Sequence, residues 1–217
     1  MDDSRQKPPA ARRVPPGAGG RMRRGRFDAV VIGASAGGVE VLGRILPSVP
    51  ASFDAALLIV MHLPPGTPSF LVQALANLCA LPVSEPDAGE PILAGHVYVA
   101  PPDYHMLVDS DANVALSIDA PVRFSRPSID ALMESAATAY GARLLGILLT
   151  GANDDGARGL AAIRAAGGTV WAQTPESALA PRMPEAAIAL GAVHETMTPA
   201  AIAARLAAWG EQRIDKE

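Results

Sequence analysis

The stretch "VVIGASAGGVE" at residues 30–40 decides the fold, because it leads from a buried strand through a glycine-rich turn into a helix. Three β-branched residues precede Gly33, and only Ala, Ser and Gly follow until the helix begins after Gly37. Two interpretations of this turn compete. It is either a nucleotide-binding loop with an altered glycine pattern, or a tight turn that presents Ser35 as a nucleophile.

Outward from this turn, short apolar runs alternate with helix-patterned stretches, which is typical of parallel sheets with crossover helices. Buried strands are expected at 28–33, 54–62, 144–151 and 168–173, and shorter, more exposed ones at 95–101 and 113–119. Helices are expected at 38–49, 69–79, 128–141, 156–167, 183–191 and 198–210. We therefore predict an α/β, doubly wound, mainly parallel sheet with helices on both faces, plus a short antiparallel hairpin.

Two of the expected helices carry finer predictions. In the helix at 38–49, the spacing of Val39, Val41, Leu42 and Ile45 predicts one apolar face turned to the core. Ser128 is expected to cap the helix at 128–141, and Ser69 to cap the one at 69–79.

Charge divides the chain into three parts. Residues 1–26 hold eight Lys and Arg against two acidic residues, with many Pro and Gly, and are expected to be a disordered basic leader. The leader has no aromatic side chain for stacking on bases, so we expect no specific nucleic-acid partner. A single catalytic domain is expected over 27–210, and a short tail over 211–217.

The composition also bears on location. No run approaches the ~20 apolar residues that span a membrane, so no membrane insertion is expected. The lone cysteine, Cys79, excludes an internal disulfide and is interpreted as a small buried hydrophobe. Although "RRGRF" at 23–27 begins with a pair of arginines like a twin-arginine export signal, the apolar run after it is too short for one. These features predict a cytoplasmic protein.

The nucleophile interpretation of the turn fits the residues better than the nucleotide one. A dinucleotide fingerprint needs glycine where Ser35 stands, and Asp54, about twenty residues on, precedes a strand instead of ending one. By contrast, residues 33–37 satisfy G-x-S-x-G, and the unpaired N–H groups of the following helix point at the same place. A plain helix cap at Ser35 remains the alternative.

A serine nucleophile needs a base, and four histidines are candidates. His62 ends a buried strand in "MHLPPG", at the sheet edge where such folds place functional side chains, and is the preferred base. His105, in a turn-rich segment, is the reserve. His96 is interpreted as a strand surface residue, and His194 as structural or exposed.

"LLTGANDDGARGL" at 148–160 supplies a carboxylate at the end of another strand. Asp154 and Asp155 both suit the acid of a triad, and both also suit a helix N-cap, so the pattern alone does not choose between them. The order Ser–His–Asp along the chain differs from the Ser–Asp–His order of α/β-hydrolases, which argues against a lipase-type fold.

Six segments in unbroken order resemble the catalytic domain of the chemotaxis protein-glutamate methylesterases, the CheB type. They are "VVIGASAGGVEVLGRIL", "VMHLPPGTPSFLVQAL", "AGHVYVAPPDYHM", "RPSIDALMESAA", "GILLTGANDDGARGL" and "MPEAAIALGAV". The resemblance implies hydrolysis of glutamate γ-methyl esters on chemoreceptors, together with glutamine deamidation. It implies neither a metal nor a cofactor, and its expected partner is a methylated chemoreceptor or similar signalling protein.

Carried over position by position, the resemblance implies Ser35 as nucleophile, His62 as base and Asp155, immediately before Gly156, as the acid. Oxyanion support is expected from Ala36, Gly37 and Ala152.

This chain also departs from the family pattern. Ala36 stands where many members have threonine, Ser125 replaces a common histidine, and 152–154 lacks a common Met-Gly pair and adds Asp154. Only the leader precedes the first strand, so no receiver domain is expected in cis. These departures motivate an alternative: a catalytically weak regulatory or binding module on the same scaffold.

Overall fold

The computed structural model of the chain describes residues 27–62 and 70–211. Its main feature is a seven-stranded parallel sheet in the order β3-β4-β2-β1-β7-β8-β9. The strands are β1 (Ala29–Ala34), β2 (Ala56–Met61), β3 (Val83–Ser84), β4 (Val97–Val99), β7 (Leu144–Leu148), β8 (Thr169–Gln173) and β9 (Glu195–Met197). A separate antiparallel hairpin consists of β5 (His105–Val108) and β6 (Val114–Ser117).

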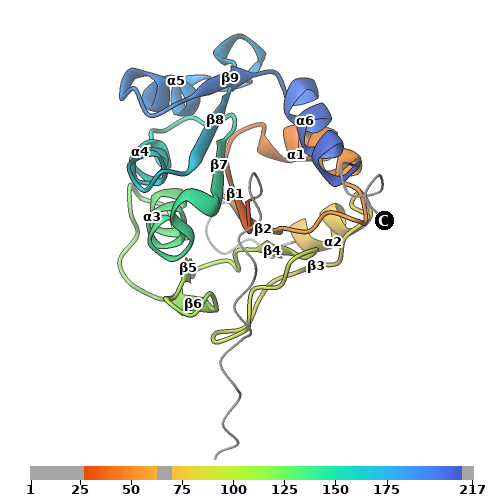
Figure 1. The fold of residues 1–217 in the computed structure, drawn as a ribbon. Helices are drawn as coiled ribbons and strands as arrows, with labels where there is room; N and C mark the ends of the chain where they lie inside the picture. Colours follow the sequence, from red (N-terminus) through yellow and green to blue (C-terminus); the bar gives the residue numbers. More distant parts are fainter. Residues whose placement is uncertain (1–26, 63–69, 212–217) are drawn as a thin grey trace, which may run out of the picture.

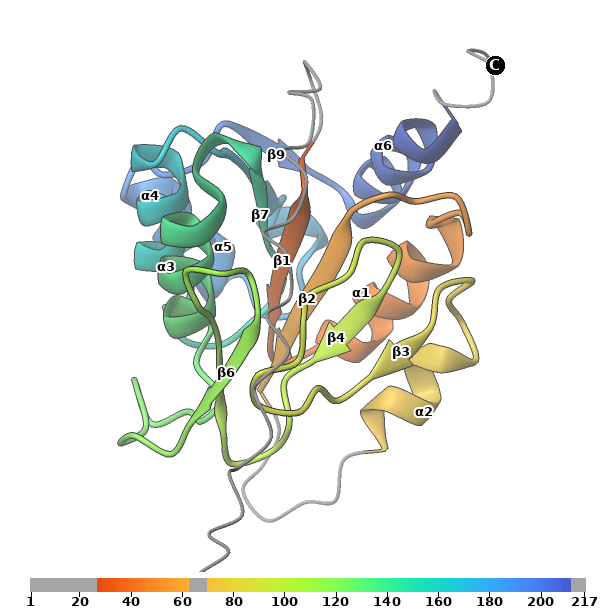
Figure 2. The same cartoon turned by 60° about the horizontal axis from the view of Figure 1, so that its bottom comes forward.

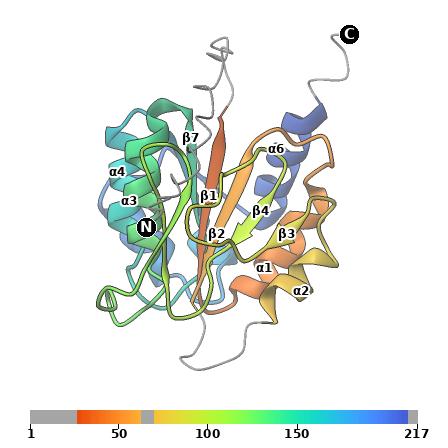
Figure 3. The same cartoon turned by 90° about the horizontal axis from the view of Figure 1, so that it is seen from below.

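Helices cover both faces of the sheet, as expected from the alternation of apolar runs with helical patterns (Figure 1). They are α1 (Gly38–Ile45), α2 (Leu71–Ala76), α3 (Ile129–Tyr140), α4 (Ala157–Ala165), α5 (Arg182–Ala189) and α6 (Pro199–Glu211). Seen along the sheet in Figure 3, α3 and α4 lie on one side, and α1, α2 and α6 on the other.

Alternation along β1 builds two separate cores. Val30 and Ile32 contribute to the cluster beside α1 and α6, whereas Val31 contributes to the cluster beside α3 and α4. Every residue of β1 and β2 is buried, which explains why these strands read as continuous apolar runs.

The central strands set the position of the candidate site. β1 pairs with β2 on one side and with β7 on the other, so the chain leaves β1 in one direction and later returns on its opposite flank. Parallel α/β sheets place their ligands at such a switch point, beyond the carboxyl ends of the strands. Ser35 follows β1, His62 follows β2, and the segment with Asp155 follows β7.

The hairpin is present but lies elsewhere along the chain. The segment at 95–101, expected to be exposed, contains β4, which is buried in the main sheet. Its place beside β6 is taken by β5, within a segment expected to be turns. The hairpin lies against α3 (Figure 2), and the Val108 N–H donates to Ser135 Oγ there.

Other differences are local. β3 and β9 were not expected, and both are very short. Val39, assigned to the core face of its helix, is 47% exposed. α6 runs one residue past the expected domain end at 210. The leader, the loop and cap expected at 63–69, and residues 212–217 lie outside the described residues. Within the described part, no helix combines the length and apolarity needed to cross a membrane.

Candidate active site

Ser35 and His62 lie next to each other at one edge of the sheet because their strands are paired. Ala34 and Met61 are register partners at the ends of β1 and β2, and the His62 N–H donates to the Ala34 carbonyl at 3.0 Å. On the other flank, the Ser35 N–H donates to the Thr150 carbonyl at 2.9 Å. The backbone of Ser35 is therefore held between the two neighbouring strands.

The turn that carries Ser35 is closed by a hydrogen bond of 2.8 Å from the Gly38 N–H to the Ser35 carbonyl. Gly37 caps α1 with a left-handed backbone (φ 81°, ψ −2°), a conformation that favours glycine. In the described part of the chain, the N–H groups of Ala36 and Gly37 have no hydrogen-bond partner. They are therefore free to receive an anionic oxygen at the start of a helix.

An open cavity of about 790 Å³ lies over this turn. Its lining includes Ser35, the loop residues Ala36 and Gly37, and His62. Val39 also lines it, which accounts for the exposure of this apolar side chain. No hydrogen bond joins the Ser35 hydroxyl to His62 or to any other described side chain, so the hydroxyl is free to reach a ligand in the cavity.

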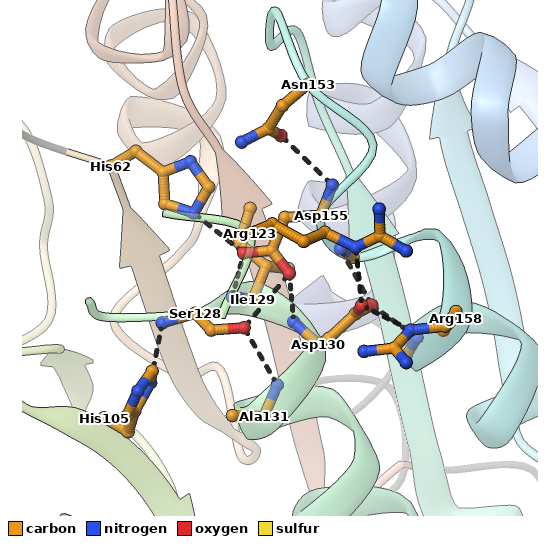
Figure 4. A network of polar contacts seen from close by, with 12 residues as sticks. His62, His105, Arg123, Ser128, Ile129, Asp130, Ala131, Asn153, Asp155 and Arg158 are labelled. Atoms are coloured by element: carbon orange, nitrogen blue, oxygen red, sulfur yellow. Dashed lines mark hydrogen bonds and ion pairs between the residues drawn. The ribbon is translucent and has the colours of Figure 1, made fainter. Parts of the chain in front are cut away.

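His62 is paired with Asp155, which comes from the loop after β7. The ring Nε2 lies 2.9 Å from Oδ2 of the carboxylate, and the side chains are 9% and 0% exposed respectively (Figure 4). Because a carboxylate only accepts, Nε2 carries the proton. Nδ1 is then the ring nitrogen left to act as a base.

The start of α3 holds Asp155 in place. Its Oδ1 accepts the Ser128 hydroxyl at 3.0 Å and the Asp130 N–H at 3.0 Å, and its Oδ2 accepts the Ile129 N–H at 2.7 Å. Ser128 caps α3, as predicted, and also accepts the Ala131 N–H. A carboxylate that receives several N–H groups at a helix N-terminus is stabilised in its charged form.

These contacts decide the ionisation of Asp155. Burial by itself would raise its pKa, but the hydrogen bond from His62 and those from the Asp130 and Ile129 N–H groups outweigh burial, and the pKa is lowered. The acid is therefore a carboxylate at neutral pH, able to orient the imidazole and to stabilise its cation.

Asp154, the extra carboxylate of this loop, points elsewhere. It pairs with Arg123 at 2.5 Å and is 40% exposed. Arg123 also lies 3.7 Å from Asp130, whose buried carboxylate accepts Arg158 Nε at 3.0 Å. The geometry thus separates the two aspartates that the sequence pattern left open: Asp155 meets His62 and Asp154 meets Arg123.

The reserve base, His105, is buried away from the cavity lining. Its Nδ1 accepts the Ser128 N–H at 3.1 Å and its Nε2 lies 3.2 Å from the Ala120 carbonyl, so both ring nitrogens are engaged. His96 is half-buried and bonded to Ser84, and exposed His194 accepts the Val170 N–H.

Several polar residues of the site were not singled out from the sequence. Thr150 and Gln173 are fully buried behind the Ser35 turn, and Asp130 is buried behind Asp155. Asp130 and Thr150 stand within segments that carry the resemblance, but no local pattern there shows which distant atoms they meet. In the described ranges, no group of three or more His, Cys, Asp or Glu side chains is arranged to hold a metal.

Comparison with known proteins adds independent findings. The model of the CheB methylesterase family matches residues 30–206. A putative protein-glutamate methylesterase/protein-glutamine glutaminase of Leptospira interrogans is 43% identical over 162 residues, which cover 75% of this chain and 84% of the relative. The Bordetella parapertussis protein-glutamate methylesterase/protein-glutamine glutaminase is 44% identical over 82% of this chain, but the match covers only 51% of that relative.

The fold is also found among solved structures. The CheB methylesterase catalytic domain of Thermotoga maritima matches with a TM-score of 0.80 and 31% identity, over 84% of this chain and 98% of that one.

Proposed function

The chain belongs to the CheB methylesterase family, and from this premise we propose that it is a serine esterase that hydrolyses glutamate γ-methyl esters on a chemoreceptor-like protein. Glutamine deamidation is its second reaction, since an amide and an ester pass through the same acyl-enzyme. The substrate is a methylated receptor or similar signalling protein met in the cytoplasm. The two activities are also named together in the relatives at 43% and 44% identity.

One observation carries this proposal. Ser35 and His62 line one open cavity, His62 is paired with buried Asp155, and the three residues follow three adjacent strands. A hydroxyl, an imidazole and a carboxylate in this order form the set that activates a serine for acyl transfer. The free N–H groups of the turn stand beside the hydroxyl, where the oxyanion forms.

The reaction follows from these positions. His62 Nδ1 takes the proton from Ser35 Oγ as the oxygen attacks the ester carbonyl, and the proton then passes to the departing methoxide, which leaves as methanol. A water, deprotonated by the same nitrogen, attacks the acyl-enzyme; the bond from the acyl carbon to Ser35 Oγ breaks, His62 returns the proton to Oγ, and the glutamate is freed. Asp155 keeps the ring in the tautomer with Nδ1 unprotonated and stabilises the imidazolium formed in each half of the reaction.

The tetrahedral intermediate needs donors for its oxyanion. The Ser35 N–H is already bonded to Thr150, so the donors are the Ala36 and Gly37 N–H groups, with Ala152 on the facing loop as further support. Each such donor contributes about 3 kcal/mol to transition-state stabilisation. The turn supplies them through the backbone, which is why alanine in place of threonine at position 36 is compatible with the chemistry.

The test measures methanol release from a methylated chemoreceptor cytoplasmic domain by the purified protein. We expect turnover by the natural sequence and by Ser48→Ala, in the short 3-10 turn after α1, and none by Ser35→Ala with an unchanged circular dichroism spectrum. A fluorophosphonate probe separates an esterase from a binding module, because only an activated serine is labelled. Unlabelled Ser35, or full turnover by Ser35→Ala, would reject the proposal.

A further inference from the structure

The orientation of one peptide group decides whether the Ser35 turn offers an oxyanion donor. Residues 35–38 form a type II turn, since Gly38 bonds back to Ser35, Gly37 has φ 81° and ψ −2°, and Ala36 is not among the non-glycine residues with positive φ. A type I turn differs mainly by a flip of the central peptide, here Ala36–Gly37. Glycine permits both forms, so Gly37 itself does not fix the direction of its N–H.

The side chain of Thr150 contacts this peptide directly. Its Oγ1 lies 2.8 Å from the Ala36 carbonyl and 3.3 Å from the Ala180 carbonyl, and it accepts the Ala180 N–H at 2.9 Å. A hydroxyl has one proton to donate, and the shorter contact gives it to Ala36. Because C=O and N–H point in opposite directions across a planar peptide, this bond turns the Gly37 N–H away from Thr150.

Thr150 is itself held firmly. It is fully buried two residues beyond the end of β7, and its N–H donates to Gln173 Oε1 at 2.9 Å. The other end of the Gln173 amide donates to the Ser177 carbonyl at 2.9 Å. The position of the Thr150 hydroxyl is therefore fixed, and a flip of the Ala36–Gly37 peptide would break its hydrogen bond to the Ala36 carbonyl.

A second turn in the same chain shows what this arrangement does with an anion. At the start of α4, Ala157 bonds back to Asp154, and Gly156 has φ 93° and ψ −17°. There the N–H groups of Gly156 and Gly159 both donate to Asp130 Oδ1, at 2.9 and 2.8 Å. The N–H groups at the equivalent positions of the first turn belong to Gly37 and Glu40, and neither has a partner among the described residues.

From these contacts we propose that Thr150 is a positioning residue: its hydroxyl locks the Ala36–Gly37 peptide in the orientation that offers the Gly37 N–H to the oxyanion. The inference rests on the proposed function, because it assigns a role within the same acyl transfer. Thr150 does not touch substrate. It acts on the transition state through the peptide that it holds.

The variants separate the hydroxyl from the shape of the side chain. Thr150→Val keeps the volume and removes the hydroxyl, whereas Thr150→Ser keeps the hydroxyl and removes the methyl group. If Thr150→Val does not fold, Thr150→Ala compared with Thr150→Ser tests the hydroxyl in the same way with smaller side chains. Thr138→Val is the control, since that hydroxyl donates to the Glu134 carbonyl on the exposed surface of α3.

For methanol release we expect Thr150→Val and Thr150→Ala to lose about 100-fold in kcat, as when one oxyanion donor is removed, with KM nearly unchanged. The kcat of Thr150→Ser and of Thr138→Val should stay within about threefold of that of the natural protein, because both variants keep a hydroxyl at position 150. A folded Thr150→Val with full kcat overturns the proposal, and so does a Thr150→Ser as slow as Thr150→Val, which would assign the effect to shape.

A second readout keeps this result distinct from the fate of the proposed substrate. The rate at which a fluorophosphonate labels Ser35 also depends on the oxyanion donors but needs no receptor. If the natural protein is labelled but releases no methanol, the methylesterase assignment fails. The labelling rates of the Thr150 variants then still test whether the Thr150 hydroxyl positions the Ala36–Gly37 peptide. If Ser35 in the natural protein is not labelled, both proposals fall.

Discussion

The imidazole of His62 meets Asp155 through Nε2, at 2.9 Å, and not through Nδ1. The ring nitrogen nearer the backbone is therefore the one left for Ser35. This follows from the topology, since His62 begins directly after β2 while the acid reaches it from across β1, in the loop after β7. The ring spans the distance between the two loops with its far nitrogen.

The first prediction concerns the acid. Asp155→Asn replaces an acceptor that fixes the Nε2–H tautomer with an amide that can present its own N–H, so kcat should fall by about 10³- to 10⁴-fold, as in serine proteases. Asp154→Asn is the matched control, one residue away and paired with Arg123 at the surface. Steady-state methanol release measures both. Equal losses in the two variants would contradict the assignment of the acid.

The second prediction is a pH dependence of stability. The pKa of Asp155 is lower in the folded protein than in the unfolded chain, so this group contributes stability that is fully present above its unfolded pKa of about 3.9 and is lost as the pH falls through its folded pKa. The free energy of unfolding of the natural protein should therefore decline below about pH 5 more steeply than that of Asp155→Asn. Urea titrations of both proteins from pH 7 to pH 3 measure the difference, and parallel curves would show that Asp155 does not contribute.

The third prediction compares two helix caps. Ser128→Ala removes both the cap of α3 and the hydroxyl that binds Asp155, whereas Thr198→Ala removes only the cap of α6, where Thr198 Oγ1 accepts the Ala201 N–H. We expect a loss of about 1 kcal/mol for the cap alone and about 1.5 kcal/mol more where a bond to a charged group goes too. Only Ser128→Ala should also lower kcat. Equal unfolding free energies would mean that the Ser128 hydroxyl acts merely as a cap.

The fourth prediction compares two glycines with the same backbone. Gly37 and Gly89 both have left-handed φ, at 81° and 83°, so alanine at either costs about 1–2 kcal/mol. A Cβ at Gly37 would lie 2.8 Å from the Leu179 Cβ, while one at Gly89 meets nothing within 4 Å. Gly37→Ala should therefore destabilise at least as much as Gly89→Ala, and it alone should slow methanol release. Thermal melts and kinetics of the pair measure this, and a slow Gly89→Ala would speak against a local effect.

The main sheet and its crossover helices were predictable because the apolar runs of β1, β2, β7 and β8 are continuous, and only two-sided burial produces that pattern. The position of Val39 was not, because helical spacing places it beside the core face while the cavity beside Ser35 keeps it exposed. β3 and β9 have too few residues to show a period.

For the candidate site, the strand ends identified Ser35 and His62 as residues of one sheet edge, and the resemblance pointed to Asp155. The contacts around them were not readable in the same way. Thr150 meets the Ser35 turn across 114 residues of the chain, Gln173 meets Thr150 across 23, and Ser128 reaches Asp155 across 27. Such pairings depend on packing of the whole domain and leave no local signal.

β1 is the middle strand of the seven, and its two neighbours carry the imidazole and the loop of the acid. Fraying that begins at β3 or β9, the outermost strands, leaves these partners undisturbed. Heat should therefore inactivate this protein only when the whole domain unfolds. Loss of the edge strands alone should not produce a form that is folded but inactive.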